Sequence, residues 1–306
     1  MRLNRTVCIV VFSLLISSCA DQYRKRIVAT GFPIVNQEQV IGYETQDLYS
    51  GIPRELNNRL IESGDFIGIN ATKVNLYPRA DLAPDSEDRM TGRLSNVMQI
   101  AASNRAQFVL SGVIRDLGVE SREYMAGAGP VAYVRSLVNN VVASRGIAID
   151  VYVHDGFTGA LLFQQRYVDD VMGDVWIPAT YTVGSERFNS TSTGEKIAEI
   201  IDQASIDIRE SLSRYPLVTR IIEIKDDEVF IDAGEQENLD IGDELEVYSA
   251  TGDHFNLDAG ISFMGKDHEP AGVLTIRNIT PRYAIGSLED PASELGVKVG
   301  DWVKSK

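Results

Sequence analysis

Residues 147–168, IAIDVYVHDGFTGALLFQQRYV, carry the clearest local pattern in this chain of 306 residues. Every second residue from Ile147 to Val153 is Ile or Val, which is the period of a half-buried β-strand. The centre, HDGFTG, contains the Asp and Gly residues that favour turns, and an apolar run returns from residue 161. This stretch therefore predicts a β-hairpin.

Apolar strand-like runs and amphipathic helical stretches alternate on either side of the hairpin. The predicted strands lie at 27–32, from 66 onward and at 108–114, and the predicted helices at 52–63, 94–101 and 197–212. Pro53 suits the first turn of its helix. Residues 77–93 are polar and predict an exposed loop, and 172–193 predict a loose segment. The order of these elements indicates one α/β domain over 27–215.

The apolar period changes to two after Pro216, which is the predicted linker. Short strands separated by Gly- and Asp-rich turns predict a small all-β barrel over 217–306. Residues 239–245, LDIGDEL, are echoed by 297–303, VKVGDWV. In both, apolar residues lead into a Gly-Asp turn, because Gly adopts the positive φ that such a turn needs. The echo supports the fold and carries no chemistry.

The N-terminus, MRLNRTVCIVVFSLLISSCA, has the pattern of a secretory signal. Two arginines precede an apolar run of ten residues, which is too short to span a membrane. Residues 16–19, ISSC, resemble a bacterial lipobox, so we expect a lipoprotein signal over 1–18, a lipid on Cys19 and a tether over 19–26. Ordinary cleavage before Asp21 is the alternative. Either cut predicts a location in the periplasm, and Ala20 after a lipidated Cys19 favours the outer membrane.

The composition narrows the class of function. Lys and Arg total 29 and Asp and Glu total 44, a net charge of −15, which argues against nucleic-acid binding because that needs a basic face. Two Cys and three His leave little material for a metal cluster or a disulfide framework. No cofactor is therefore expected.

Residues that could carry chemistry are few. Neither a nucleophile elbow, a phosphate-binding loop nor an HExxH motif is present. His154 lies beside Asp155 in the hairpin turn, and we interpret it as structural rather than as a base or metal ligand. The polar insertion at 250–270 contains His254 and His268, but its spacing matches no Ca²⁺ loop or Zn²⁺ site. This favours a binding or assembly role over an enzyme.

Several short motifs resemble the flagellar assembly protein T (FlgT) family. They are RIVATGF at 26–32, GYE at 42–44, IPREL at 52–56 and SG at 111–112 for its middle domain, and FIDAG at 230–234, GD at 242–243, GVL at 272–274 and VGD at 299–301 for its C-terminal domain. The resemblance implies a TolB-N-like α/β domain followed by an SH3-like barrel. We expect the family's first domain to be missing, because the first strand begins eight residues after Cys19.

The same resemblance implies a structural, non-enzymatic role in the H-ring, which surrounds the outer-membrane-side rings of the basal body. The implied partners are further copies of the chain in a ring, other basal-body ring proteins and stator-associated proteins. A lipid on Cys19 would replace the missing domain as an outer-membrane anchor. Ring closure needs heterologous interfaces with buried apolar anchors.

Two stretches that flank the hairpin, 124–145 and 172–193, are the predicted subunit contacts. The residues chosen are Tyr124, Tyr133, Val134, Trp176, Tyr181 and Phe188. The alternative is a secretion channel, because a lipobox before a TolB-like domain also resembles curli secretion lipoproteins of the CsgG type. There the two stretches would be transmembrane strands of a pore, although LVNNVV at 137–142 lacks the required alternation.

Overall fold

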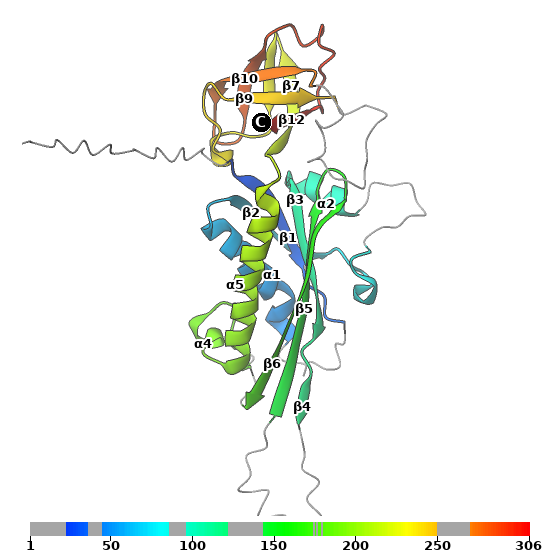
Figure 1. The fold of residues 1–306 in the computed structure, drawn as a ribbon, viewed down its shortest axis with the longest axis vertical. Coiled ribbons are helices and arrows are strands. Elements are labelled where there is room, and N and C mark those ends of the chain that lie inside the picture. Colours follow the sequence, from blue (N-terminus) through cyan, green and yellow to red (C-terminus); the bar gives the residue numbers. More distant parts are fainter. Residues whose placement is uncertain are drawn as a thin grey trace, which may run out of the picture.

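The computed structural model describes residues 23–35, 45–85, 96–121, 143–173, 175, 177–178, 180–249 and 270–306. The predicted signal, Cys19 and nearly all of the 250–270 insertion lie outside the described residues. The described chain forms an α/β domain and a closed β-barrel, stacked along the longest axis of the molecule (Figure 1). The predicted fold class is therefore confirmed.

The α/β domain is built on one mixed sheet. Its strands are β1 (Lys25–Gly31), β2 (Phe66–Asn75), β3 (Phe108–Asp116), β4 (Val119–Ser121), β5 (Ala143–Asp155) and β6 (Leu161–Gly173). The strand β1 lies between β2 and β3 and is parallel to both, whereas β5 is antiparallel to β3, β4 and β6. The predicted hairpin is thus the β5–β6 pair, with two strands of 13 residues each.

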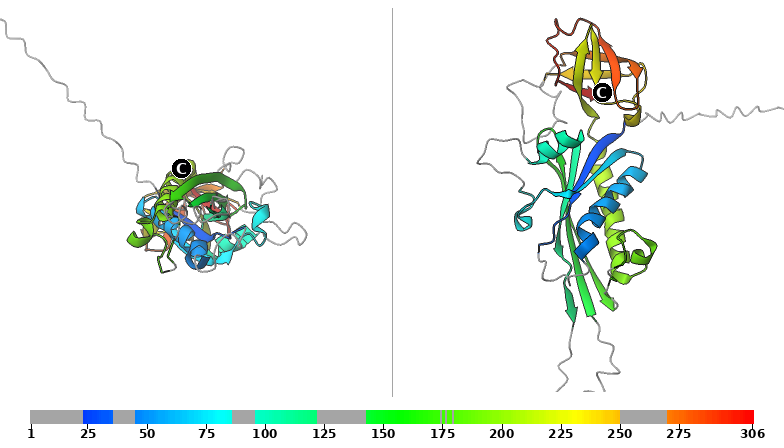
Figure 2. Two further views of the ribbon diagram at one scale, coloured as in Figure 1. Left: turned by 90° about the horizontal axis from the view of Figure 1, so that it is seen from below. Right: turned by 180° about the vertical axis from the view of Figure 1, so that it is seen from behind.

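Helices cover the two faces of this sheet unequally (Figure 2). One face packs on α1 (Thr45–Glu62) and α5 (Ser192–Ser213) through Leu56, Ile149, Ile201 and other buried apolar residues. The short α4 (Glu186–Asn189) precedes α5. The opposite face is covered over part of its length by α2 (Asn96–Asn104) and by the segment that contains η2 (Ala80–Leu82). No helix among the described residues is long and apolar enough to cross a membrane.

The barrel closes in the order β10-β11-β8-β7-β12-β9. Its strands are β7 (Val218–Lys225), β8 (Glu228–Ile231), β9 (Glu244–Tyr248), β10 (Gly272–Ile279), β11 (Ala284–Leu288) and β12 (Trp302–Ser305), and η3 (Glu235–Glu237) connects β8 to β9. Its apolar side chains form a core of their own, separate from both cores of the α/β domain. The two Gly-Asp turns adopt the predicted conformation, with φ of 100° at Gly242 and 96° at Gly300.

The helix α1 begins seven residues before the predicted start, so the placement of Pro53 in its first turn is wrong. Proline has no N–H, so the carbonyl four residues earlier, that of Tyr49, loses its helical partner. The backbone N–H of Phe32 donates to that carbonyl at 2.9 Å. A bond from the end of β1 therefore replaces the missing helical bond and lets the helix continue through Pro53.

Two predicted loops are also more ordered than expected. Tyr77 and Ala83 are buried, because the guanidinium of Arg115 donates to the backbone carbonyls of Ala80, Asp81 and Ala83 and holds this segment against the sheet. The part of 172–193 that follows residue 179 contains α4 and the start of α5. The secretion-channel alternative would require a strand in this stretch. Its described part contains no strand beyond Gly173.

Candidate functional site

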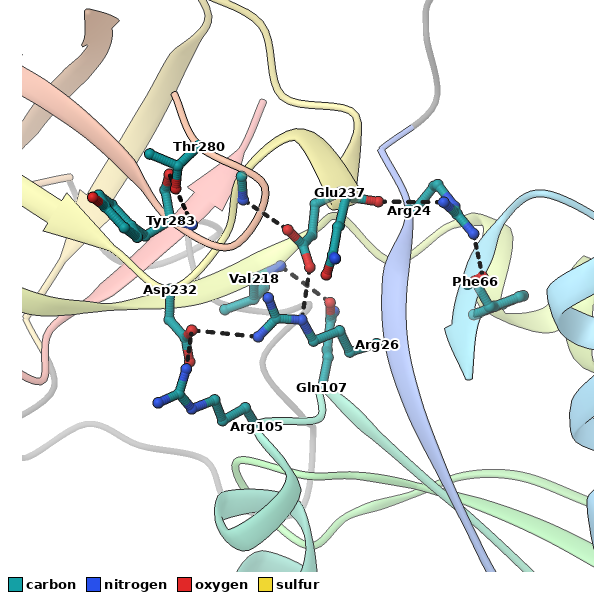
Figure 3. Close-up of polar contacts among 12 residues, drawn as sticks. Arg24, Arg26, Phe66, Arg105, Gln107, Val218, Asp232, Glu237, Thr280 and Tyr283 are labelled. Carbon is teal, nitrogen blue, oxygen red and sulfur yellow. Dashed lines mark hydrogen bonds and ion pairs between the residues drawn. The ribbon is translucent and has the colours of Figure 1, made fainter. Parts of the chain in front are cut away.

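The two domains meet at a junction that is held by charged side chains (Figure 3). Arg26 of β1 donates from Nε to Glu237 Oε1 at 2.6 Å and from Nη1 to Asp232 Oδ1 at 3.4 Å. Arg105, which follows α2, donates to the same Asp232 oxygen at 3.3 Å. Burial raises the pKa of the Glu237 carboxyl, although the Gly234 N–H and Arg26 both stabilise its charged form. Removing Arg26 would therefore leave a buried carboxylate without its counter-charge.

One buried amide holds the linker between the domains. Gln107 Nε2 donates to the carbonyl of Pro216 at 2.8 Å, and Gln107 Oε1 accepts from the N–H of Val218 at 3.2 Å. The Gln107 carbonyl also accepts from the N–H of Gly156, at the turn of the β5–β6 hairpin. A single residue between α2 and β3 is thus bonded to the hairpin turn, the linker and the first strand of the barrel.

The turn of the hairpin reaches the barrel through Phe157. Its ring lies 6.0 Å from the ring of Trp302, centroid to centroid, and the Arg220 guanidinium carbon lies 5.2 Å from its centroid. Burial lowers the pKa of Arg220. Among the described residues, no carboxylate oxygen lies within 4.0 Å of the Arg220 guanidinium, so the aromatic face is its main contact.

The chain that enters β1 is also fixed at the junction. Lys25 is buried and donates from Nζ to the carbonyl of Leu212 at 3.1 Å, at the C-terminal end of α5, where a cation is favourable. Burial lowers the pKa of Lys25 to about 8. Tyr23 packs against the barrel core, and burial together with Asp243 raises its pKa to about 12. Residues 23–26 therefore belong to both domains.

A cavity of about 270 Å³ opens between the domains at this point. Its lining includes the three arginines Arg26, Arg105 and Arg220 and the two carboxylates of Asp232 and Glu237. The remaining wall is mostly small or apolar, with Met98, Ala102 and Phe157 among its side chains. Residues from β1, α2, the hairpin turn and the barrel all contribute, so the cavity exists only while the domains are joined.

The structure describes two of the six predicted subunit-contact residues, Tyr181 and Phe188. Tyr124, Tyr133, Val134 and Trp176, like Cys19, lie outside the described residues. Tyr181 is partly buried against the core of the α/β domain. Phe188 is 1% exposed inside that core, so its selection as a contact residue is wrong. Its N–H donates to Ser185 Oγ, the N-cap of α4, and the Ser-x-x-Phe spacing was the available signal.

The two most exposed large apolar side chains of the described residues lie on β6. Val168 is 68% exposed and Met172 is 75% exposed, whereas their neighbours Tyr167 and Val171 are buried against α5. Side chains alternate between the faces of a strand, so Val168 and Met172 lie on the face opposite α5. The sequence shows that β6 alternates between two faces, but it does not show which face is buried. The reason is that Tyr167 and Val171 on one face and Val168 and Met172 on the other are all apolar or aromatic.

His154 is buried, as the structural interpretation requires, and Asp155 accepts hydrogen bonds from the N–H groups of Phe157 and Thr158 in the turn. Burial lowers the pKa of His154 to about 4, and its Nδ1 has no hydrogen-bond partner among the described residues. No group of three His, Cys, Asp or Glu side chains within the described ranges could hold a metal ion.

These features define an α/β domain joined to a closed barrel by a bonded junction. The family model for the middle domain of flagellar assembly protein T matches residues 17–182, which is more than half of the chain. The chain belongs to the flagellar assembly protein T family. This confirms the family that the short motifs indicated.

Similar solved structures come from several bacterial proteins. The hypothetical protein CT253 from Chlamydia trachomatis is 16% identical at a TM-score of 0.37, over 62% of this chain and 97% of that one. The PelC dodecamer from Paraburkholderia phytofirmans is 11% identical at a TM-score of 0.30, over 62% of this chain and 89% of that one. TolB from Acinetobacter baumannii is 11% identical at a TM-score of 0.29, over 86% of this chain and 46% of that one. A search of curated proteins gave no significant match.

Proposed function

We propose that this protein is a non-enzymatic structural subunit of the flagellar basal body. Copies of the chain would pack into a ring in the periplasm, on the outer-membrane side, and support flagellar assembly or stator recruitment. Membership of the flagellar assembly protein T family supports the flagellar role. The observation that carries the ring is the exposed apolar surface of β6 at an open edge of the sheet.

The sheet has two open edges among the described residues. The strand β6 pairs only with β5, and β2 pairs only with β1. Because β1 is parallel to β2 and β3, and two antiparallel steps lead from β3 to β6, the edge strands run in the same direction. Rotation about an axis along the strands would bring β6 of one copy beside β2 of the next. Such a head-to-tail contact forms a ring when the rotation between neighbouring copies divides a full turn.

The surface formed by Arg166, Val168, Asp170 and Met172, here the β6 face, has the composition of an interface. The two apolar side chains alternate with one positive and one negative residue, so the surface carries no net charge. The chain as a whole carries −15 and repels other copies of itself. Copies of an acidic chain repel one another least where the local charge is balanced, which makes the β6 face the favoured place for close approach.

The test replaces both apolar residues, Val168→Glu and Met172→Glu, in one variant. We expect the variant to fold but to be absent from basal bodies purified from cells that make no other copy. The matched control is Ile241→Glu with Val299→Glu, two residues of the barrel that are 66% and 60% exposed. Basal bodies that retain the β6-face variant at the wild-type level would exclude this contact. Absence of the wild-type protein from basal bodies would exclude the ring itself.

Anchoring to the outer membrane is tested separately. If Cys19 carries the lipid, Cys19→Ala should move the protein from the membrane fraction to the soluble periplasmic fraction. Cys8 lies inside the signal, so Cys8→Ala is the matched control and should change nothing. Unchanged fractionation of Cys19→Ala would exclude the lipid anchor while leaving the ring untouched.

A further inference from the structure

The cavity at the domain junction is lined by one arginine, Arg220, that has no carboxylate partner among the described residues. Of its three arginines, Arg26 bonds to both carboxylates of the lining. Arg220 has no carboxylate partner among the described residues and rests on the ring of Phe157. A guanidinium that is partly desolvated and held on an aromatic face is well placed to bind an incoming anion.

A second arginine of the cavity lining, Arg105, has an unusual backbone conformation. It follows the last residue of α2 and has a φ of 52°, the left-handed conformation that helix ends usually assign to Gly. The N–H of Ala106 donates to the carbonyl of Ala101, which completes the helix end. Arg costs more than Gly in this conformation. Its side chain is 64% exposed at the cavity and shares Asp232 with Arg26. One Nη of Arg105 bonds to Asp232, and the other N–H donors of this guanidinium remain for a second carboxylate.

The size and wall of the cavity restrict the ligand. A volume of about 270 Å³ lies just below the range of pockets for drug-sized molecules, so one residue-sized group fits. Arginine forks recognise carboxylates by paired hydrogen bonds. Met98, Ala102 and Phe157 provide an apolar wall beside the arginines. We propose that the junction cavity binds a carboxylate of a partner protein's acidic segment, with Arg220 and Arg105 holding the carboxylate and the apolar wall holding an adjacent apolar side chain.

The test uses N-acetyl-L-phenylalanine, which carries a free carboxylate next to an apolar ring, on the purified protein labelled with ¹³C at its methionine methyl groups. Met98 lines the cavity, whereas Met172 lies on the β6 face and serves as an internal control. We expect the Met98 methyl signal to shift with saturation and the Met172 signal to stay in place. The amide of the same compound, which has no charge, should bind at least about tenfold more weakly, because a hydrogen bond to a charged group contributes that much.

Variants separate binding from folding. Arg220→Gln should weaken the binding of N-acetyl-L-phenylalanine about tenfold or more. Arg105→Gly should weaken binding as well, and it should not lower the melting temperature by more than a degree or two, because Gly suits the left-handed conformation. Arg187 is exposed on α4, away from the junction, so Arg187→Gln is the matched control and should bind as the wild type does.

Three results would overturn the proposal. The first is no shift of Met98, or a shift of Met172 as large. The second is equal affinity for the acid and its amide, which would show that the carboxylate is not recognised. The third is unchanged binding in Arg220→Gln, which would place the ligand elsewhere. None of these depends on ring formation, so the proposed function could fail while this proposal stands.

Discussion

The two ends of the β5–β6 hairpin have opposite surroundings. At the turn, Phe157 packs against Trp302 and Arg220, and the N–H of Gly156 is bonded to Gln107. Further along β6, the side chains of Val168 and Met172 are more than two-thirds exposed. Within the described part of the chain, this pair of strands is thus enclosed at its turn and exposed further along β6.

The difference separates what the subunit needs to fold from what remains for partners. Contacts at the turn fix the barrel on the α/β domain, so changes there should lower stability. Among the described residues, the exposed side chains of Val168 and Met172 have no comparable contact, so changes there should affect assembly and leave folding almost untouched. Four predictions test this contrast, beginning with the largest expected effect.

Replacing Gln107 by Ala should have the largest effect. The substitution leaves the carbonyl of Pro216 and the N–H of Val218 without partners in a buried place, and each such group costs about 1–3 kcal/mol. We expect the free energy of unfolding in urea to fall by about 3 kcal/mol. Gln203→Ala on the exposed side of α5 is the control and should cost under about 0.5 kcal/mol. Equal losses in the two variants would mean that the junction is not a stabilising contact.

Acid should destabilise the protein through His154. Its pKa is about 4 in the folded protein and about 6.5 when unfolded, so between these values the unfolded chain binds more protons. Stability therefore falls as the pH drops from about 6.5 to 4, by about 3 kcal/mol in total. In His154→Leu, the difference in unfolding free energy from the wild type should change by that amount over this window. A constant difference would show that His154 titrates normally.

Phe157→Ala should lower stability by about 1–2 kcal/mol, because the ring is half-buried and loses its contacts with Trp302 and Arg220. Phe157→Leu retains part of the apolar contact and should lie between the variant and the wild type. Urea unfolding followed by tryptophan fluorescence measures both. A loss in the Leu variant as large as in the Ala variant would assign the whole effect to the aromatic ring.

The smallest effect on stability is expected for the β6-face variant that carries Val168→Glu and Met172→Glu. Exposed residues without buried partners change the free energy of unfolding by less than about 0.5 kcal/mol each. The melting temperature at low protein concentration checks this. A large drop would place these side chains inside the fold and end the contrast between the two ends of the hairpin.

The sequence predicted those parts of the fold that depend on local patterns. The strands at 27–32 and 108–114, the hairpin and the long helix before Pro216 all follow from apolar spacing within a few residues. The start of α1 was missed because the bond that replaces the missing N–H of Pro53 comes from Phe32, about twenty residues earlier. Local rules do not contain such a partner.

The junction was not predictable for the same reason. Arg26 and Glu237 are 211 residues apart in the chain, and Gln107 and Pro216 are 109 apart. Within their own stretches, Arg26, Gln107 and Glu237 look like ordinary polar residues. Phe188 was misassigned because an aromatic residue in a polar segment indicates either a small local core or an interface, and only the packing of α4 distinguishes them.

The contact of Tyr23 with the barrel sets the length of any tether. Tyr23 is the fourth residue after Cys19, and an extended chain spans at most about 3.5 Å per residue, or about 14 Å over these four steps. If Cys19 carries a lipid, the membrane surface lies within that distance of the place where the two domains join. The subunit would then be attached to the membrane near its domain junction, with the barrel on one side of the attachment point and the sheet on the other.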